Sequence, residues 1–164
     1  MSLIGDFYQI GVVVRDIDEG MERYRRLLGL GPFFRLDTDY EGRYRDWRGR
    51  IANRNAFTRW GAAYLEMIEP GVGESNAKEW LHTRGEGIFH LGYAVDDMTQ
   101  RPGGAPCVFE SWGARLANGE AAVIHLDTVA ELGYFTELSD RGLVARLNGA
   151  IDGFLQEQGV EVGA

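Results

Sequence analysis

The hydrophobic and polar positions of this chain repeat one scheme in its two halves. Residues 8–17 (YQIGVVVRDI) align with residues 89–98 (FHLGYAVDDM), and residues 64–69 (YLEMIE) align with residues 135–140 (FTELSD). The apolar run that opens each half, with its β-branched residues, predicts a strand. An internal repeat bears on the whole fold, and a repeat over half of the chain indicates a two-fold duplication rather than a solenoid.

The first half is predicted to form a strand, a helix and further strands. Asp16 or Asp18 can cap a helix that runs to Leu28, because apolar residues recur on one face and residues 29–32 (GLGP) end it. Strands are expected at residues 8–14, 33–37, 51–59 and 62–69, and a short linker helix is expected at residues 76–83.

The second half repeats this scheme less regularly. A strand is expected at residues 89–95, but prolines and glycines at residues 102–106 interrupt the helix that should follow and leave residues 106–112 for it. Further strands are expected at Leu116, 121–127 and 133–138. After Asp140 an amphipathic helix is expected, with Leu143, Leu147, Ile151, Phe154 and Leu155 on one side. We assign this apolar side to core or subunit packing.

Composition narrows the class of protein. The net charge of −8 argues against nucleic acid as the main partner, and the longest apolar runs are far shorter than a membrane span. A single cysteine, Cys107, excludes an internal disulfide and, with no visible signal peptide, suits the cytoplasm. We therefore expect a cytoplasmic protein of one structural domain that binds neither membranes nor nucleic acid.

The repeat carries polar residues at matched positions. Gln9 aligns with His90, and Glu66 aligns with Glu137. A carboxylate among apolar neighbours in a strand is costly to bury unless it is paired or binds a cation. One such glutamate is better explained as a solvent-facing residue. Two at matched positions, with glutamine and histidine at the other pair, favour a metal site.

Three stretches of the chain resemble a known family. Residues 78–92 (KEWLHTRGEGIFHLG), 64–70 and 121–140 are similar to methylmalonyl-CoA epimerases. More broadly, the paired strand–helix–strands pattern resembles the vicinal oxygen chelate superfamily, which also includes glyoxalase I, extradiol dioxygenases and bleomycin or fosfomycin resistance proteins. The resemblance covers nearly the whole chain apart from the C-terminal helix.

The resemblance implies an α+β fold with two tandem βαβββ modules, residues 1–75 and 76–140, that form a curved mixed sheet around a cavity. A C-terminal helical extension, residues 141–164, follows. Members of the superfamily often dimerise, so a homodimer is expected.

The resemblance also implies that Gln9, Glu66, His90 and Glu137 hold a divalent metal ion. The epimerases usually have histidine at the position of Gln9, whereas glyoxalase I of the eukaryotic type is similar to this chain there. One nitrogen and three oxygen ligands suit Zn, Ni, Co, Mn or Mg. A dioxygenase is the least favoured class, because its iron site needs two histidines and one carboxylate, and a single ligating histidine is counted here.

A metal in this site would acidify the α-proton of a carbonyl substrate, and Glu66 and Glu137 are the natural pair to remove and return that proton. We therefore expect a metal-dependent isomerase, epimerase or glyoxalase-type lyase acting on a small carbonyl compound or thioester. The alternative is a non-catalytic protein of the bleomycin-resistance type that sequesters a ligand.

Three further residues are candidates for the site. His125 lies in the predicted strand 121–127, and is either a second acid–base group or substrate contact, or a histidine hydrogen-bonded to its neighbours. Most arginines between residues 43 and 59 are expected to pair with surface acids. Arg50 and Arg54 are kept as candidate contacts to an anionic small-molecule substrate.

Overall fold

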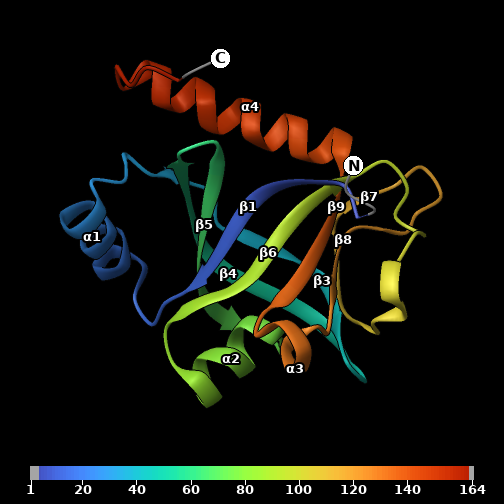
Figure 1. The fold of residues 1–164 in the computed structure, drawn as a ribbon. Helices are drawn as coiled ribbons and strands as arrows, with labels where there is room; N and C mark the ends of the chain where they lie inside the picture. The colour runs from blue at the N-terminus through green and yellow to red at the C-terminus, as the bar shows by residue number, and fades with distance from the viewer. Residues whose placement is uncertain (1–3, 163–164) are drawn as a thin grey trace.

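The computed structural model describes residues 4–162 and shows a strand-rich α+β fold (Figure 1). The strands are β1 (Asp6–Val13), β2 (Phe34–Arg35), β3 (Thr38–Tyr44), β4 (Trp47–Trp60), β5 (Ala63–Val72), β6 (Gly87–Val95), β7 (Cys107–Arg115), β8 (Ala121–Leu126) and β9 (Phe135–Asp140). The helices are α1 (Ile17–Leu28), α2 (Asn76–Arg84), α3 (Val129–Leu132) and α4 (Arg141–Glu157), with a 3-10 turn, η1, at Pro102–Gly104. None of the described helices is both long enough and apolar enough to cross a membrane.

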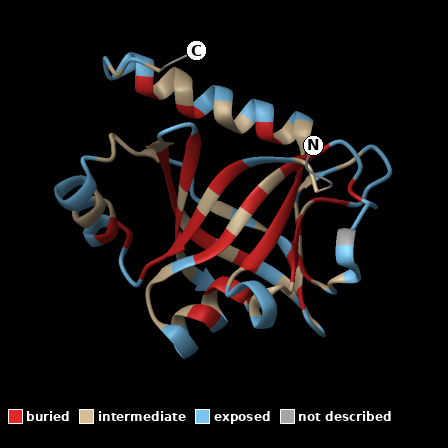
Figure 2. Cartoon of the chain, in the orientation of Figure 1, coloured by how far each residue is buried: buried red, intermediate tan, exposed pale blue. Residues whose placement is uncertain are grey.

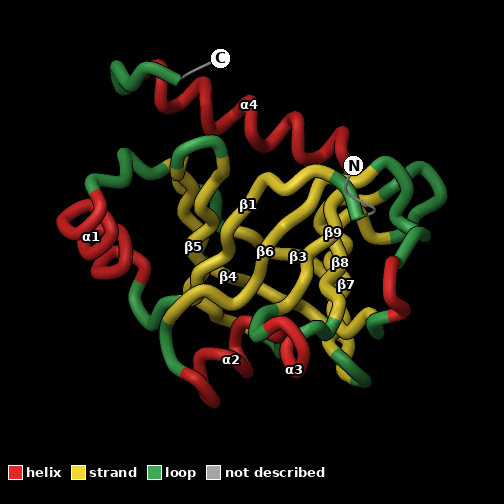
Figure 3. The backbone as a smooth tube through the Cα atoms, viewed as in Figure 1, coloured by secondary structure: helices red, strands yellow, loops and turns green. Residues whose placement is uncertain are grey.

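The strands form one closed sheet. Around it the order is β4-β3-β7-β8-β9-β6-β1-β5, and β5 pairs again with β4, while the short β2 pairs with β4 beyond the end of β3. The strands in Figure 3 accordingly wrap around an interior. Because side chains alternate along each strand, one set from every strand points into this interior. The predicted α+β class, curved sheet and C-terminal helix are confirmed, while the division into modules at residues 1–75, 76–140 and 141–164 stays a prediction.

Four adjacent strands carry the matched positions of the sequence repeat. β1 lies parallel to β5 and antiparallel to β6, and β6 lies parallel to β9. The central pair, β1 and β6, opens the two halves of the chain, and the outer pair, β5 and β9, holds the two glutamates. The interior between these strands is therefore the place where the four predicted ligands can meet.

Helix α1 has the predicted boundaries. The Asp16 side chain accepts a hydrogen bond from the backbone N–H of Glu19, and Gly29 ends the helix in the left-handed conformation. The helix packs on the outside of the sheet, where Ile17 and Met67 are fully buried. It therefore supports β4 and β5 from outside and leaves the interior free.

Helix α4 lies across one end of the sheet (Figure 1). Arg59 donates two hydrogen bonds of 2.8 Å to the Asp152 carboxylate, and the Tyr64 hydroxyl donates a third, also of 2.8 Å. Ile151 and Leu155 of this helix are fully buried, and Figure 2 shows the buried positions of the helix turned toward the sheet. The predicted apolar side thus packs within the chain and closes this end of the interior.

The segment after β6 differs from the prediction. A helix at residues 106–112 is wrong, because Cys107–Arg115 form β7, which pairs with β3 on one side and with β8 on the other. Closing the sheet requires an extended segment at this place, and pairing along both edges overrides the weak local signal for a helix.

The hairpin of β3 and β4 was also largely missed. The sequence suggested strands at 33–37 and 51–59, but the structure has only the short β2 in the first range and begins β4 at Trp47. Charged residues and Gly42 within Thr38–Tyr44 hid the strand β3. Leu116, where a strand was expected, lies between the end of β7 and the turn at Ala117 and Asn118.

Candidate metal and proton-transfer site

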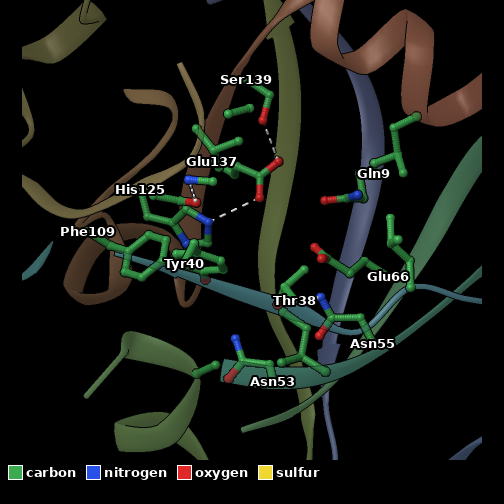
Figure 4. A pocket seen from close by; sticks show the side chains of 18 of the residues that line it. Gln9, Thr38, Tyr40, Asn53, Asn55, Glu66, Phe109, His125, Glu137 and Ser139 are labelled. Atoms are coloured by element: carbon green, nitrogen blue, oxygen red, sulfur yellow. Dashed lines mark hydrogen bonds and ion pairs between the residues drawn. The ribbon is translucent and has the colours of Figure 1, made fainter. Parts of the chain in front are cut away.

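Five polar side chains converge inside the closed sheet, each from a different strand. They are Gln9 (β1), Glu66 (β5), His90 (β6), His125 (β8) and Glu137 (β9). Figure 4 shows Gln9, Glu66, His125 and Glu137 pointing into one space. The structure therefore brings the four predicted metal ligands together with His125.

The ring nitrogen Nε2 of His90 lies at the centre of this cluster. It is 3.0 Å from Gln9 Oε1, 3.4 Å from Glu137 Oε2 and 3.6 Å from Glu66 Oε2. Neighbouring ligands of an octahedral dication with bonds of about 2.1 Å lie about 3.0 Å apart. The observed spacings therefore suit donors placed around one ion.

The orientation of the Gln9 amide tests whether a cation fits. As oriented, its oxygen faces only acceptors, an arrangement that is repulsive unless a cation lies among them. With the amide turned over, its nitrogen would donate to His90 Nε2 at 3.0 Å, to Glu66 Oε2 at 3.1 Å and to Glu137 Oε1 at 3.3 Å. Gln9 thus suits both states of the cluster, since its nitrogen satisfies the carboxylates alone and its oxygen can ligate a divalent ion.

Two glycines make room for the cluster. Gly11 is the neighbour in register of both Glu66 and His90, and a Cβ atom there would overlap the His90 ring. A Cβ atom on Gly92 would lie 3.1 Å from Glu137 Oε1. The site therefore requires a small residue two positions after Gln9 and two positions after His90, and this spacing can be seen in the sequence.

Glu137 is held by three hydrogen bonds. Its carboxylate accepts from the Tyr8 hydroxyl at 2.6 Å, the Ser139 hydroxyl at 2.9 Å and His125 Nε2 at 3.1 Å. Burial raises the pKa of this carboxyl, but the two neighbouring histidines and the Tyr8 hydrogen bond outweigh burial and lower the pKa to about 2. Glu137 is therefore a fixed, ionised carboxylate.

Glu66 has a different environment. Its carboxylate lies 3.6 Å from His90 Nε2 and 3.1 Å from the Gln9 amide, which can donate to it only with the amide turned over. Burial, and then the charge of Glu137, raise the pKa of Glu66 well above its usual value. Its side chain is 14% exposed against 5% for Glu137, and it lines the cavity. Glu66 is therefore the looser and more accessible carboxylate.

The two histidines have different partners. Asn76 Nδ2 donates to His125 Nδ1 at 2.6 Å, which leaves the proton on Nε2 to be donated to Glu137. Burial lowers the pKa of His90 to about 3, so its ring is neutral at neutral pH. In this arrangement His90 Nε2 can act as a ligand, whereas His125 orients Glu137.

The sequence argument against a dioxygenase counted one ligating histidine, and the structure places a second histidine, His125, beside it. His90, His125 and Glu137 each offer a ligand atom within 4.8 Å of one another. The hydrogen bond from His125 Nε2 to Glu137 leaves one histidine nitrogen, that of His90, free to ligate in the described arrangement. The argument against a dioxygenase therefore depends on the hydrogen bond between His125 and Glu137 rather than on the number of histidines, and it stays a prediction.

A cavity of about 360 Å³ adjoins the cluster. Leu143, Val144 and Leu147 of α4 close one side of it, so the C-terminal helix, to which the sequence assigned no chemistry, shapes the site. The carboxylates that line the cavity are Asp37, Asp39, Glu66 and Glu137. No lysine or arginine is among the described residues that line it.

The two candidate arginines lie elsewhere. Arg50 binds Asp39 through hydrogen bonds of 2.8 and 2.7 Å, and Arg54 binds Asp18 at 2.9 Å and Glu69 at 3.0 Å. Neither lines the cavity. The geometry thus gives no support to a substrate contact by Arg50 or Arg54, and both follow the surface pairing expected for most arginines of this segment.

Sequence reasoning missed Tyr8, Ser139 and Asn76. Ser139 lies two residues from Glu137 on the same strand face, so alternation alone could have indicated it. Tyr8 is adjacent to Gln9 and should face the other way. A register shift between Phe7 and Gln9 in the pairing of β1 with β6 lets both side chains reach the interior, and no sequence signal marks this shift.

Comparison with solved structures shows relatives of the same fold. A variant of Streptomyces coelicolor methylmalonyl-CoA epimerase in complex with 2-nitronate-propionyl-CoA is 24% identical, with a TM-score of 0.58 over 84% of this chain and 97% of that chain. Methylmalonyl-CoA epimerase from Mycobacterium tuberculosis is 23% identical, with a TM-score of 0.57 over 88% of this chain and 95% of that chain. A hypothetical protein from Bacillus halodurans is 22% identical, with a TM-score of 0.55 over 82% of this chain and 93% of that chain.

No curated protein sequence matches the chain significantly. The model of one protein family matches residues 8–103, which is more than half of the chain and includes Gln9, Glu66 and His90. The chain therefore belongs to the glyoxalase/bleomycin resistance protein/dioxygenase superfamily.

Proposed function

We propose that this chain catalyses metal-dependent transfer of an α-proton on a small carbonyl compound or thioester, as an isomerase, an epimerase or a glyoxalase-type lyase. The observation that carries the proposal is the contrast between two carboxylates in one cluster. Glu137 accepts hydrogen bonds from Tyr8, Ser139 and His125, whereas Glu66 accepts at most one, from the Gln9 amide turned over. Paired carboxylates whose environments separate their pKa values are typical of acid–base sites.

The residues that would hold the metal are Gln9, Glu66, His90 and Glu137. A bound divalent ion would acidify the α-proton of a carbonyl compound. The spacing of the donors supports such an ion, because His90 Nε2 lies 3.0 Å from the Gln9 side-chain amide, 3.4 Å from Glu137 Oε2 and 3.6 Å from Glu66 Oε2. Zn, Ni, Co, Mn and Mg all accept this set of one nitrogen and three oxygens.

Glu66 is the group we assign to proton transfer. It takes the proton from the α-carbon, and the electron pair of the broken C–H bond moves toward the carbonyl oxygen of the substrate. Return of the proton to the same face of that carbon restores its configuration, return to the opposite face after the intermediate has turned over inverts it, and return to a neighbouring carbon gives an isomer. Glu137 stays ionised and in place, because Tyr8, Ser139 and His125 hold it.

The similar structures support an epimerase-like activity without fixing the substrate. Two of those structures are methylmalonyl-CoA epimerases, one with a CoA ligand bound. At this level of identity the likeness concerns the fold, and function depends on the site. Homodimerisation and a cytoplasmic location stay predictions.

Metal content and proton exchange test the proposal together. We expect untagged wild-type protein to contain about one divalent ion per chain, and to exchange the α-proton of erythrulose or of methylmalonyl-CoA in D₂O, followed by proton NMR. Glu66→Gln should keep most of the ion and slow exchange by about 10²–10⁴-fold. Glu137→Gln should lose both.

The contrary result is a wild-type protein that takes up no ion after incubation with Zn, Ni, Co and Mn. It would move the protein to the sequestering class, for which the aromatic lining of the cavity, Tyr8, Tyr40, Phe57, Phe89 and Phe109, is suited. Equal exchange by Glu66→Gln and wild type would instead contradict the assignment of Glu66.

A further inference from the structure

The cavity contains a second group of polar side chains away from the metal cluster. Asn53, Asn55 and Thr38 line it from β4 and β3, and Tyr40 and Ser111 line it from β3 and β7. Figure 4 shows Asn55 close to Glu66, with Thr38, Asn53 and Tyr40 farther along the same cavity. All of these side chains are uncharged at neutral pH, unlike the carboxylate cluster.

One atom of this group lacks a partner. The Asn55 side chain donates from Nδ2 to Thr38 Oγ1 at 3.3 Å, but its Oδ1 has no hydrogen-bond partner in the described part of the chain. Asn55 is only 4% exposed. A buried acceptor without a partner is unfavourable, so this oxygen is available to accept a hydrogen bond from a ligand that enters the cavity.

The position of Asn55 relates it to the carboxylate assigned to proton transfer. Phe57 is the neighbour of Glu66 in the pairing of β4 with β5, and Asn55 is two residues before Phe57 on the same strand face. Two residues along a strand span about 7 Å. A hydroxyl or amide donor bound by Asn55 would therefore lie a few bonds from a carbon that reacts at Glu66.

The charges around the cavity disfavour an anion. Asp37 and Asp39 line it on the side of β3, in addition to the two glutamates of the cluster. Arg35 and Arg50 bind these aspartates at 3.2 and 2.7 Å but do not line the cavity. With a dication balancing Glu66 and Glu137, no uncompensated positive charge is left among the described lining residues to receive a carboxylate or phosphate.

The size of the cavity also limits the ligand. Its volume of about 360 Å³ is near the lower end of the range of about 300–1,000 Å³ that is usual for small-molecule sites. A compound of four to six carbons fits within it, whereas a CoA thioester is several times larger and would leave most of its atoms outside.

We infer that Asn55, with Thr38, forms a specificity site for an uncharged hydroxylated carbonyl compound, whose hydroxyl donates to Asn55 Oδ1 while its α-carbon lies at Glu66. The part of the inference that concerns the reaction rests on the proposed proton transfer. The part that concerns ligand binding at Asn55 does not. It names the substrate class as a small neutral hydroxyketone or hydroxyaldehyde rather than an acyl-CoA.

The test compares the binding of two neutral probes with the same number of carbons to metal-loaded protein. Erythrulose carries hydroxyls beyond its carbonyl carbon, and 1-hydroxybutan-2-one lacks them. We expect wild type to bind erythrulose about tenfold more tightly in titration calorimetry, which is the effect of one additional hydrogen bond, to Asn55 Oδ1. In Asn55→Leu this preference should disappear while the metal content stays that of wild type.

Asn148→Leu is the matched control, because Asn148 Oδ1 is also a buried acceptor without a partner in the described chain but lies on α4 and does not line the cavity. It should keep the tenfold preference. Failure of wild type to bind erythrulose, equal binding of the two probes, or an unchanged preference in Asn55→Leu would overturn the inference.

Methylmalonyl-CoA separates this inference from the proposed function. If the protein exchanges the α-proton of methylmalonyl-CoA and does not bind erythrulose, proton transfer stands and the neutral specificity site is refuted. If the protein binds erythrulose through Asn55 but exchanges no α-proton, the specificity site stands and the proposed reaction is refuted.

Discussion

The two glutamates of the site occupy matched positions in the two halves of the chain, yet their surroundings are opposite. Glu137 accepts hydrogen bonds from Tyr8, Ser139 and His125, whereas Glu66 accepts none from the matching places. The counterparts of those three donors in the other half are Phe89, Ile68 and Phe57, by the sequence repeat for the first two and by strand register for the third. Each donor is thus replaced by a side chain that cannot donate.

This difference shows how a repeated scheme can yield unequal groups. The backbone positions of the two carboxylates are alike, because β1 with β5 and β6 with β9 pair in the same parallel manner. Three neighbouring side chains decide which carboxylate is held and which is left to react. Removing these donors beside Glu137, or adding one beside Glu66, should therefore make the two carboxylates more alike.

Replacing His125 by leucine should make the surroundings of Glu137 more like those of Glu66. Removing a partner that orients a metal ligand typically costs about 10–100-fold in metal affinity, and we expect a loss in this range. Competition with a chromophoric chelator measures it. Phe57→Leu is the control at the matching place beside Glu66, and a similar loss there would contradict the assigned role of His125.

Replacing Tyr8 by phenylalanine should remove the shortest hydrogen bond to Glu137, 2.6 Å long, and leave the rest of the ring in place. A hydrogen bond to a charged group contributes about 1.5–3 kcal/mol. We expect metal-free protein to lose free energy of unfolding near the lower end of this range, because Ser139 and His125 remain. Urea unfolding gives the value, and Tyr24→Phe, at a half-buried tyrosine on α1, should lose far less.

Ile68→Ser adds to the first half the hydroxyl that Ser139 supplies in the second. A new hydrogen bond to Glu66 should hold that carboxylate and slow α-proton exchange about fivefold, the equivalent of about 1 kcal/mol. Ile68→Ala controls for the lost volume without adding a donor. If the two variants exchange protons at the same rate, the reaction does not depend on leaving the Glu66 carboxylate without a hydroxyl donor.

The sequence indicated the four-residue cluster because strand alternation is a strong rule. Gln9 and Gly11 on one strand, and His90 and Gly92 on another, must share faces wherever the strands form. Local sequence patterns could not predict which strands pair with one another. The segment at β7 extends because β3 and β8 flank it, and Tyr8 turns inward because of a register shift next to Gln9.

Residues around the cavity were harder to predict than the cluster itself. Asn55 is one of many polar residues in β4, and only the fold shows that it faces the interior while Arg54 faces outward to Asp18 and Glu69. The apolar side of α4 was correctly predicted as packing, but the surface against which it packs became visible only when the sheet closed.

Closure of the sheet restricts how substrate range can change in evolution or in the laboratory. Every strand around the cavity is hydrogen-bonded on both sides, so the girth of the interior cannot widen without breaking a ladder. New volume must come from shorter side chains, and Leu143 and Leu147 of α4 offer it without altering a strand. Diversification toward bulkier compounds is therefore expected to begin in the C-terminal helix, the part of the chain that lies outside the repeat.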